Sequence, residues 1–158
     1  MDKEAASIAL VLVTVLAVFA AIQPILPASS EPFSELGVLG PGQQIGGYPT
    51  SVVAGSPLHL YGYVGNHEGV STYYQLLVKV GNQTTQVSNS TYAQAPIIFT
   101  YSQVLENNQT ITFPLTLTLG NPGTDVRLIF ELWSYNVNSA SFGYTGLWNQ
   151  LLLNVTSH

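Results

Sequence analysis

Residues 109–119, QTITFPLTLTL, alternate between polar and apolar side chains. Every odd position from Ile111 to Leu119 is apolar, and the positions between them hold Thr or Pro114. A period of two places one face of a β-strand in a core and leaves the other in solvent. Pro114 lies on the solvent phase and has no N–H, so we expect this strand to be an edge strand or to contain a bulge.

The same alternation recurs on both sides of this stretch, between turn signals spaced 8–12 residues apart. Asn66-His-Glu-Gly69 is expected to join two of these strands as a hairpin-like turn, and Gly120-Asn-Pro-Gly123 supplies another turn. The pattern predicts an all-β fold, an antiparallel β-sandwich of immunoglobulin-like type. The further expected strands are 58–64, 74–80, 97–102, 126–136 and 147–155, with weaker candidates at 35–39 and 51–53.

The stretch 126–136 carries bulky side chains on both of its faces. Val126, Leu128, Phe130 and Leu132 form one face and predict core contacts, while the opposite face includes Arg127, Ile129, Glu131, Trp133 and Tyr135. We expect this second face to meet a partner or a sugar layer. Arg127 and Glu131 stand about 13 Å apart along the strand, so they cannot bond each other directly.

The N-terminal region is apolar rather than alternating. From Ala5 to Ile22 the chain reads AASIALVLVTVLAVFAAI, without a charge, and as a helix it would span about 27 Å of a bilayer. This pattern predicts an N-terminal transmembrane helix that precedes the sandwich and contacts the lipid bilayer. The expected organisation is an anchor over 1–27, a linker over 28–34 and an extracytoplasmic β-sandwich over 35–158. A cleaved signal peptide is the alternative interpretation of residues 1–27.

Composition excludes several kinds of function. Charged residues make up 7% of the 158 residues and the formal net charge is −5, whereas nucleic-acid binding needs clustered Lys and Arg. We therefore expect no nucleic-acid partner. The absence of Cys excludes disulfides, thiolate zinc sites, Cys-ligated iron–sulfur clusters and blue-copper sites.

Four N-glycosylation sequons support an extracellular location for the expected sandwich, with the N-terminus in the cytoplasm. The acceptors are Asn82, Asn89, Asn108 and Asn154. Chance predicts about two sequons for this content of Asn, Ser and Thr. A chain rich in Asn and Thr also forms sequons freely, which is the alternative. N-linked glycans are thus expected partners, and these four Asn residues are the only site residues that the sequence predicts.

No residue set in the sequence indicates a reaction. His67 and Glu68 are adjacent in a turn, where neighbouring side chains seldom converge on one point, and His59 is isolated on a strand. The carboxylates are scattered, and no nucleophile motif, phosphate-binding loop or dinucleotide fingerprint occurs. We therefore expect a protein that is not an enzyme, with no catalytic residue, no cofactor and no metal site.

Several short segments, in order, resemble a known family. They are Phe33-Ser-Glu-Leu, Leu39-Gly-Pro-Gly42, Tyr48-Pro-Thr50, the Asn66–Gly69 turn and the closing stretch from Leu147 to Thr156. Together they resemble domain-of-unknown-function family 1616, which is found largely in archaeal membrane proteins. The resemblance covers residues 33–156 and implies an extracytoplasmic β-sandwich tethered to a membrane. It implies no chemistry, since the family has none assigned.

Two functions follow from these observations. The first is a non-catalytic accessory or structural subunit, anchored in the cell membrane by a single pass, that belongs to a larger membrane or cell-surface complex. The second is a secreted surface-filament subunit that polymerises after signal cleavage, with Ala28–Leu39 added as a donor strand to the next subunit. Ligand or carbohydrate binding by exposed aromatic side chains is a third, weaker hypothesis. Cleavage of residues 1–27 separates the first two.

Overall fold

The computed structural model describes residues 31–157. The expected anchor over 1–27, including the apolar run from Ala5 to Ile22, lies outside the described residues. Within residues 31–157, no helix is long and apolar enough to cross a membrane. The chain from Pro32 onward forms one compact unit, whose first strand begins at Phe33, inside the expected linker.

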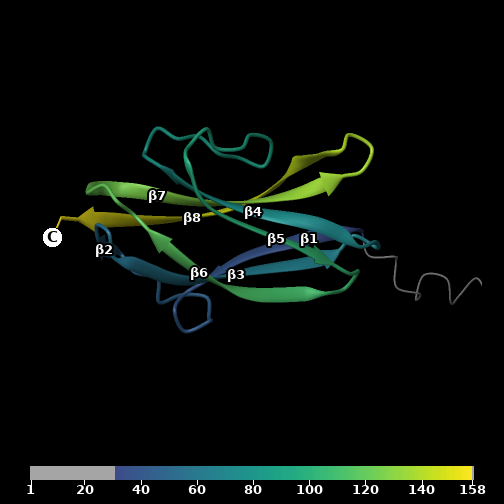
Figure 1. The fold of residues 1–158 in the computed structure, drawn as a ribbon, viewed down its shortest axis with the longest axis horizontal. Coiled ribbons are helices and arrows are strands. Elements are labelled where there is room, and N and C mark those ends of the chain that lie inside the picture. The colour runs from purple at the N-terminus through teal and green to yellow at the C-terminus, as the bar shows by residue number, and fades with distance from the viewer. Residues whose placement is uncertain (1–30, 158) are drawn as a thin grey trace, which may run out of the picture. The chain divides into compact units, whose positions relative to one another are not determined.

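Two β-sheets pack face to face, as Figure 1 shows, so the expected β-sandwich is confirmed at the level of its two layers. One sheet has three strands in the order β1-β3-β6, and the other has five in the order β2-β8-β7-β4-β5. The strands are β1 (Phe33–Leu39), β2 (Ser51–Val53), β3 (Pro57–His67), β4 (Thr72–Gly81), β5 (Ile97–Leu105), β6 (Thr110–Thr118), β7 (Gly123–Asn136) and β8 (Ser141–Thr156).

Strand β6 confirms the edge position expected from Pro114. It pairs only with β3 in the three-stranded sheet. Pro114 lies opposite Tyr61 of β3 and is exposed to solvent. Its apolar phase is buried as predicted, with Phe113, Leu115 and Leu117 in the core. An edge strand tolerates proline because one side of its backbone has no partner to lose.

The core lies between the inner faces of the two sheets. Leu128, Phe130 and Leu132 of β7 are fully buried there, which confirms the predicted inward face of this strand. Tyr101 of β5 stacks on Phe113 of β6 across the two layers, with ring centroids 3.7 Å apart. Gly62 of β3 leaves room for that ring, because a Cβ atom there would meet Phe113 Cζ at 2.6 Å. The stacking of Tyr101 on Phe113 therefore requires a glycine at position 62.

One pair of neighbouring strands departs from the predicted antiparallel sandwich, because its two strands run parallel. The short strand β2 runs parallel to the end of β8, with Ser51 opposite Asn154 and Val53 opposite Thr156. All other neighbouring strands are antiparallel. A strand of three residues carries too short a pattern to indicate its direction.

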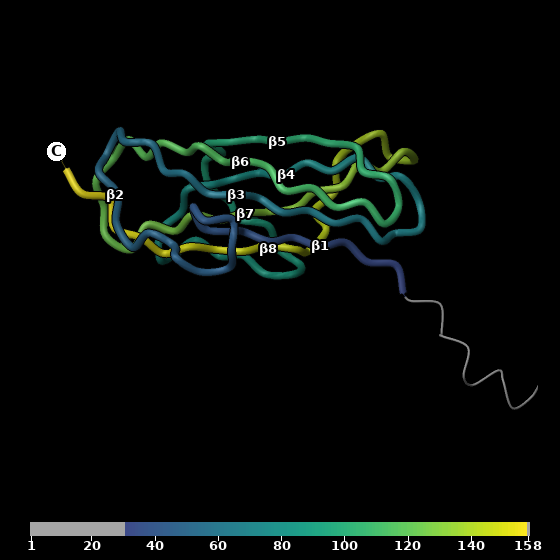
Figure 2. The backbone as a smooth tube through the Cα atoms, turned by 90° about the horizontal axis from the view of Figure 1, so that it is seen from below, coloured from purple at the N-terminus to yellow at the C-terminus, as the bar shows by residue number. Residues whose placement is uncertain are grey.

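The prediction of a hairpin at Asn66–Gly69 is wrong. Strand β3, before this turn, belongs to the three-stranded sheet, whereas β4, after it, belongs to the five-stranded sheet. The turn therefore crosses from one layer to the other, and Figure 2 shows it at the same end of the molecule as the start of β1. Turn residues indicate that the chain reverses direction, but they do not say whether the two strands share hydrogen bonds or face each other across a core.

The prediction that the second face of β7 meets a partner or a sugar layer is wrong for the middle of that strand. Residues 82–96, which we call the cap, cross the outer face of the five-stranded sheet (Figure 1). Under the cap, Ile129 and Glu131 have no exposed surface. The chain covers the middle of this face itself, while Asp125 and Tyr135 toward the two ends of the strand remain exposed.

Candidate functional site

Three turns meet the start of β1 at one end of the sandwich, as the strand registers show. Phe33 pairs with His67, Thr72 with Leu105, and Asn136 with Ser141. The turns β3–β4, β5–β6 and β7–β8 therefore lie at the end where β1 begins. We call this the entry end, and it contains the Asn66–Gly69 turn on which the family resemblance partly rests.

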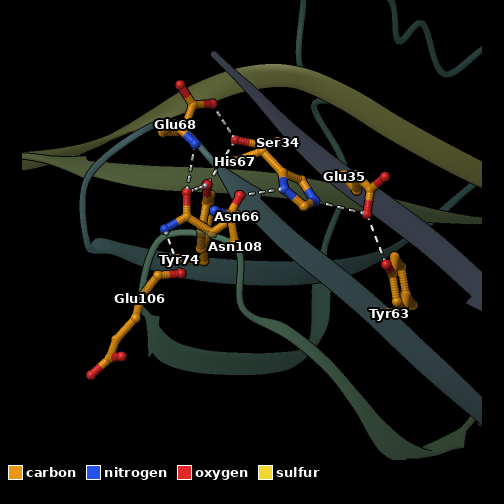
Figure 3. Close-up of polar contacts among 9 residues, drawn as sticks. All are labelled: Ser34, Glu35, Tyr63, Asn66, His67, Glu68, Tyr74, Glu106 and Asn108. Carbon is orange, nitrogen blue, oxygen red and sulfur yellow. Dashed lines mark hydrogen bonds and ion pairs between the residues drawn. The ribbon is translucent and has the colours of Figure 1, made fainter. Parts of the chain in front are cut away.

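Asn66 joins two of these turns from a fully buried position. Its Nδ2 donates to the carbonyl oxygens of Val70 at 2.8 Å, Leu105 at 2.9 Å and Glu106 at 3.1 Å. Its Oδ1 accepts from the backbone N–H of Glu68 at 3.0 Å (Figure 3). One amide thus satisfies polar groups of both the β3–β4 turn and the β5–β6 turn, and so ties the two sheets together.

Ser34 extends this network to the first strand. Its Oγ donates to Glu68 Oε1 at 2.5 Å and lies 2.7 Å from the Tyr74 hydroxyl, which also donates to Asn66 Oδ1 at 3.2 Å. Burial raises the pKa of Tyr74, and the nearby Glu68 carboxylate raises it further, although the hydrogen bond with Ser34 lowers it. Tyr74 therefore stays a neutral donor, which suits a structural tie better than a base.

His67 and Glu68 point to different partners, as expected of adjacent turn residues. The His67 ring stacks on Phe33 at 4.6 Å, its Nε2 lies 3.5 Å from Glu35 Oε2, and its Nδ1 lies 3.2 Å from Asn108 Oδ1. Glu68 turns instead toward Ser34. The two side chains do not form one site.

Glu35 also accepts a hydrogen bond from the Tyr63 hydroxyl at 2.7 Å. This hydrogen bond, together with partial burial and the charge of Glu35, raises the pKa of Tyr63. The carboxylate therefore holds a tyrosine and a histidine on the outer face of the three-stranded sheet. In the part of the chain that the structure describes, no three His, Asp or Glu side chains lie close enough to hold a metal ion.

A groove of about 550 Å³ opens beside the network. Its walls include the apolar side chains of Phe33, Val70 and Leu147 and the polar side chains of Ser34 and Glu68. Glu68 is its only charged lining residue, and that carboxylate already accepts from Ser34. The groove therefore combines apolar walls with one carboxylate and a few hydroxyl groups.

All four predicted glycan acceptors are exposed. Asn82 and Asn89 lie in the cap, Asn108 lies in the β5–β6 turn at the entry end, and Asn154 lies within β8. Asn82 Oδ1 accepts from the backbone N–H of Thr84 at 2.9 Å, which leaves its Nδ2, the glycan-bearing atom, directed elsewhere. The four acceptors thus sit on three separate segments rather than in one site.

Sequence reasoning missed a buried ion pair beneath the cap. Lys79 Nζ lies 2.8 Å from Glu131 Oε2, with side chains 5% and 0% exposed. Lys79 Nζ donates to the Ala93 carbonyl oxygen at 2.8 Å, and Glu131 Oε1 accepts from the Ala93 N–H at 2.5 Å. The Lys79 ammonium also lies 5.1 Å from the Tyr92 ring centroid, and Trp133 donates to Glu131 at 3.2 Å. The sequence did show opposite charges, Lys79 and Glu131, on the outward faces of two predicted strands. Recognising them as a pair required the register of those strands, which the sequence does not give.

A tyrosine provides the second tie between the cap and the sheet. The Tyr144 hydroxyl donates to the Ser88 carbonyl oxygen at 2.8 Å. Burial, with a contribution from the Glu131 carboxylate, raises the pKa of Tyr144 to about 12. Nearby, Gly146 has a φ of +83°, and a Cβ atom there would meet Asn89 O at 2.5 Å, so the cap packs directly on the β8 backbone.

Comparison with solved structures gives the fold. A CARDB domain from Pyrococcus furiosus, solved in complex with di-metal ions, has a TM-score of 0.50 at 10% identity, over 80% of this chain and 90% of that one. A β-glucosidase from Listeria innocua has a TM-score of 0.49 at 12% identity over 80% of this chain, which spans 16% of the glucosidase. Spo0M, a sporulation control protein from Bacillus subtilis, has a TM-score of 0.44 at 11% identity, over 79% of this chain and 50% of that one. At these identities the first similarity shows the β-sandwich fold alone, and the other two support no argument.

Comparison with protein families gives the relationship. No curated protein sequence matches the chain significantly. One family does match, over residues 27–148, which include the Asn66–Gly69 turn and most of both sheets. Because this match covers most of the chain, the protein belongs to the family described as Domain of unknown function (DUF1616).

Proposed function

We propose that the protein is a non-catalytic subunit of a larger membrane or cell-surface complex, anchored in the membrane by Ala5–Ile22, with its sandwich outside the cell. The observation that carries this proposal is the short distance in sequence between the apolar run and the first strand. Residues 23–32 separate them, so the sandwich follows the run almost directly. A single span followed by a complete domain is the organisation of a signal-anchored protein.

The hydrogen bonds at the entry end support a non-catalytic role. Asn66, Ser34 and Tyr74 are engaged with each other or with backbone groups, and Glu68 accepts from Ser34. A catalytic acid or base needs a free lone pair or proton within reach of a substrate. These side chains instead hold turns together, which is the chemistry of a scaffold.

The sequons support the extracellular side. Asn82, Asn89, Asn108 and Asn154 are exposed, as acceptors of N-linked glycans must be. Their distribution over the cap, a turn and a strand would cover several faces with sugar. The faces left uncovered would then be available to protein subunits.

The filament alternative gains no support from the position of β1. Residues 33–39 of the suggested donor segment, Ala28–Leu39, pair along their whole length with β3 of the same chain. Donation to a neighbour would require these hydrogen bonds to break and the sandwich to lose one of its three-stranded sheet's edge strands. No described feature favours that exchange over the intramolecular pairing.

Extraction and co-purification from native membranes test the proposal. We expect a C-terminally tagged protein to remain in the membrane pellet after alkaline carbonate washing and to co-purify with other subunits in fixed ratio. Val13→Arg places a charge at the centre of the apolar run, at a cost of about 3 kcal/mol of insertion free energy, and should reduce the membrane fraction. Val13→Leu is the matched control and should behave as the wild type. A wild-type protein released by carbonate, or one purified without partners, would contradict the proposal.

A further inference from the structure

Several large apolar side chains are exposed at the entry end. Residues 31–157 contain twelve large apolar side chains that are exposed, and half of them lie at this end. They come from β1, from the β3–β4 and β7–β8 turns, and from the ends of β4, β5 and β7. These residues are Phe33, Val70, Tyr73, Val104, Tyr135 and Val137.

Aromatic side chains form the centre of this surface. Tyr73 lies 5.0 Å from Phe142 and 6.2 Å from Tyr135, and Tyr135 lies 5.4 Å from Phe142, measured between ring centroids. Val104 is the register partner of Tyr73. Each of these four residues lies within two residues of a strand terminus at the entry end. The cluster, which we call the entry patch together with Val137 in the adjacent turn, is not covered by the cap.

The course of the chain indicates what covers the entry patch. Strand β1 begins at this same end, and the apolar run ends at Ile22. Residues 23–32 can bridge at most about 35 Å when fully extended. If the run spans a bilayer, the entry end is the part of the sandwich that the connection holds nearest to the lipid surface.

We propose that the entry patch docks on the headgroup region of the lipid bilayer, so that the sandwich is held against the membrane by its surface as well as by its anchor. This inference rests on the proposed anchor. Tyrosine suits the position because its ring is apolar while its hydroxyl bonds to headgroups and water, and aromatic residues gather at membrane interfaces for this reason.

The charges at the same end define the lipid chemistry. The carboxylates there are Glu31, Glu35, Glu68 and Glu106. His67 lies beside Glu35, and the remaining titratable groups at this end are tyrosine hydroxyls, which are neutral at pH 7. Carboxylates repel anionic headgroups. The surface that fits the entry patch is therefore zwitterionic or neutral, and at pH 7 docking should weaken when anionic lipid is added.

A single-cysteine experiment tests this proposal, since the natural chain contains no Cys. Full-length Val137→Cys carries a fluorophore and is reconstituted in phosphatidylcholine vesicles that contain a headgroup-labelled nitroxide quencher. Ile45→Cys is the matched control, because Ile45 is 87% exposed against 79% for Val137 and lies in the loop after β1, away from the entry end. We expect quenching at least threefold stronger at position 137 than at position 45.

A second set of variants separates docking from simple proximity. In the Val137→Cys background, Tyr73→Ser, Tyr135→Ser and Phe142→Ser together should lower the quenching to near the level at position 45. Ile97→Ser, Ile98→Ser and Leu152→Ser change three apolar side chains away from the entry end and should leave it unchanged. Circular dichroism and thermal melting establish that both triple variants remain folded.

Each other outcome overturns the proposal. Equal quenching at positions 137 and 45 would show that the entry end does not face lipid. Quenching that survives the aromatic triple substitution would show that the tether alone brings position 137 to the surface. A benzophenone at position 137 that crosslinks to protein instead of lipid in native membranes would assign the patch to a protein partner. Retention of the protein after carbonate washing is measured on the same vesicles. A protein that stays in the vesicles but shows no quenching at position 137 contradicts only the docking of the entry patch. A protein that the wash releases contradicts the proposed anchor as well.

Discussion

Asn66 has the largest structural role of any single polar side chain at the entry end. Its amide makes hydrogen bonds to two turns and to Tyr74 from a position with no exposed surface. A buried carbonyl or N–H that loses its partner keeps the desolvation cost without the compensating bond. The Asn66–Gly69 turn is therefore better explained by the closure of the sandwich than by chemistry at its surface.

The Asn66→Ala variant should be destabilised by about 3 kcal/mol, because it leaves several buried backbone groups without partners. Urea unfolding followed by circular dichroism measures the free energy of unfolding. Asn107→Ala is the matched control: Asn107 Oδ1 accepts from the Gly69 N–H at 2.9 Å at an exposed position, and its loss should cost less than about 1 kcal/mol. Equal losses in the two variants would contradict the role assigned to Asn66.

Tyr144 makes the stability of the domain fall as the pH rises through the alkaline range. Its pKa of about 12 in the folded state exceeds the ordinary value of 10, so the folded state holds the phenolic proton more tightly than the unfolded chain does. The stabilisation is complete below pH 10 and is lost as the pH rises from 10 through 12. The difference in free energy of unfolding between the wild type and Tyr144→Phe should therefore shrink over that range.

Denaturant unfolding at pH 8, 10 and 11.5 measures this difference. The raised pKa values of Tyr63 and Tyr74 affect both proteins equally, so the comparison isolates Tyr144. A difference that stays constant across the three pH values would contradict the burial of the Tyr144 hydroxyl beneath the cap.

At the level of residues, the sequence indicated which side chains face the core but not which polar groups meet. The alternation in 109–119 and 126–136 correctly placed Phe113 and Phe130 inside. Two of the partners of Asn66, the carbonyl groups of Leu105 and Glu106, lie 39 and 40 residues away at the end of β5, and no local pattern reports such a contact. Lys79 and Glu131 were unrecognised for the same reason, because their contact depends on the register of two strands.

The cap is the element that most changes the surface expected from the sequence. It buries the outer face of the five-stranded sheet through an ion pair, and the backbone of Ala93 bonds to both Lys79 and Glu131. A buried charge that loses its partner is costly, since the remaining ion has neither water nor a counter-charge. The attachment of the cap therefore depends on both members of the pair.

The Lys79→Met variant should lose about 3–5 kcal/mol of stability and loosen the cap. In a Trp148→Phe background, the fluorescence of Trp133 should shift to longer wavelength, because Tyr92 in the cap packs 5.0 Å from the Trp133 ring. Urea unfolding and emission spectra measure the two effects.

Arg127→Met is the comparison for this change, because Arg127 also holds the cap, but through Thr85 near the start of the cap and away from Tyr92 and Trp133. Arg127 is a basic residue on the same outer face whose contacts are with Gln150 and the Thr85 carbonyl oxygen, at partly exposed positions. Its removal should cost about 1 kcal/mol and leave the Trp133 emission unchanged. A red shift in Arg127→Met but not in Lys79→Met would contradict the account of the cap.

Strands were predictable as elements because a half-buried strand repeats its pattern every two residues. Their assignment to sheets was not, as the Asn66–Gly69 turn shows: the same turn residues serve a hairpin and a crossing between layers. The alternation of apolar and polar side chains could not predict the cap either, since residues 82–96 are mostly polar and show no regular spacing of apolar residues. Its anchoring residues are spread over β4, β7 and β8.

At the scale of the whole molecule, the ends and faces of the sandwich differ in character. The cap covers one outer face, exposed sequons lie on the cap, a turn and a strand, and the entry end carries apolar and acidic side chains together. Two of the three basic residues in the chain, Lys79 and Arg127, are used to hold the cap. The Asn108 sequon lies in the β5–β6 turn of the entry end, so the part of this end that suits a neutral lipid layer is the entry patch on the five-stranded sheet.

The retention of residues 1–27 is the central claim of the account. Intact-mass and N-terminal peptide mass spectrometry on the protein from native membranes tests it most directly. We predict a mature chain that keeps residues 1–27 and carries glycan mass on Asn82, Asn89, Asn108 and Asn154. A chain that begins near Ser29 or Ser30 would contradict the anchor, and with it both the proposed function and the docking of the entry patch.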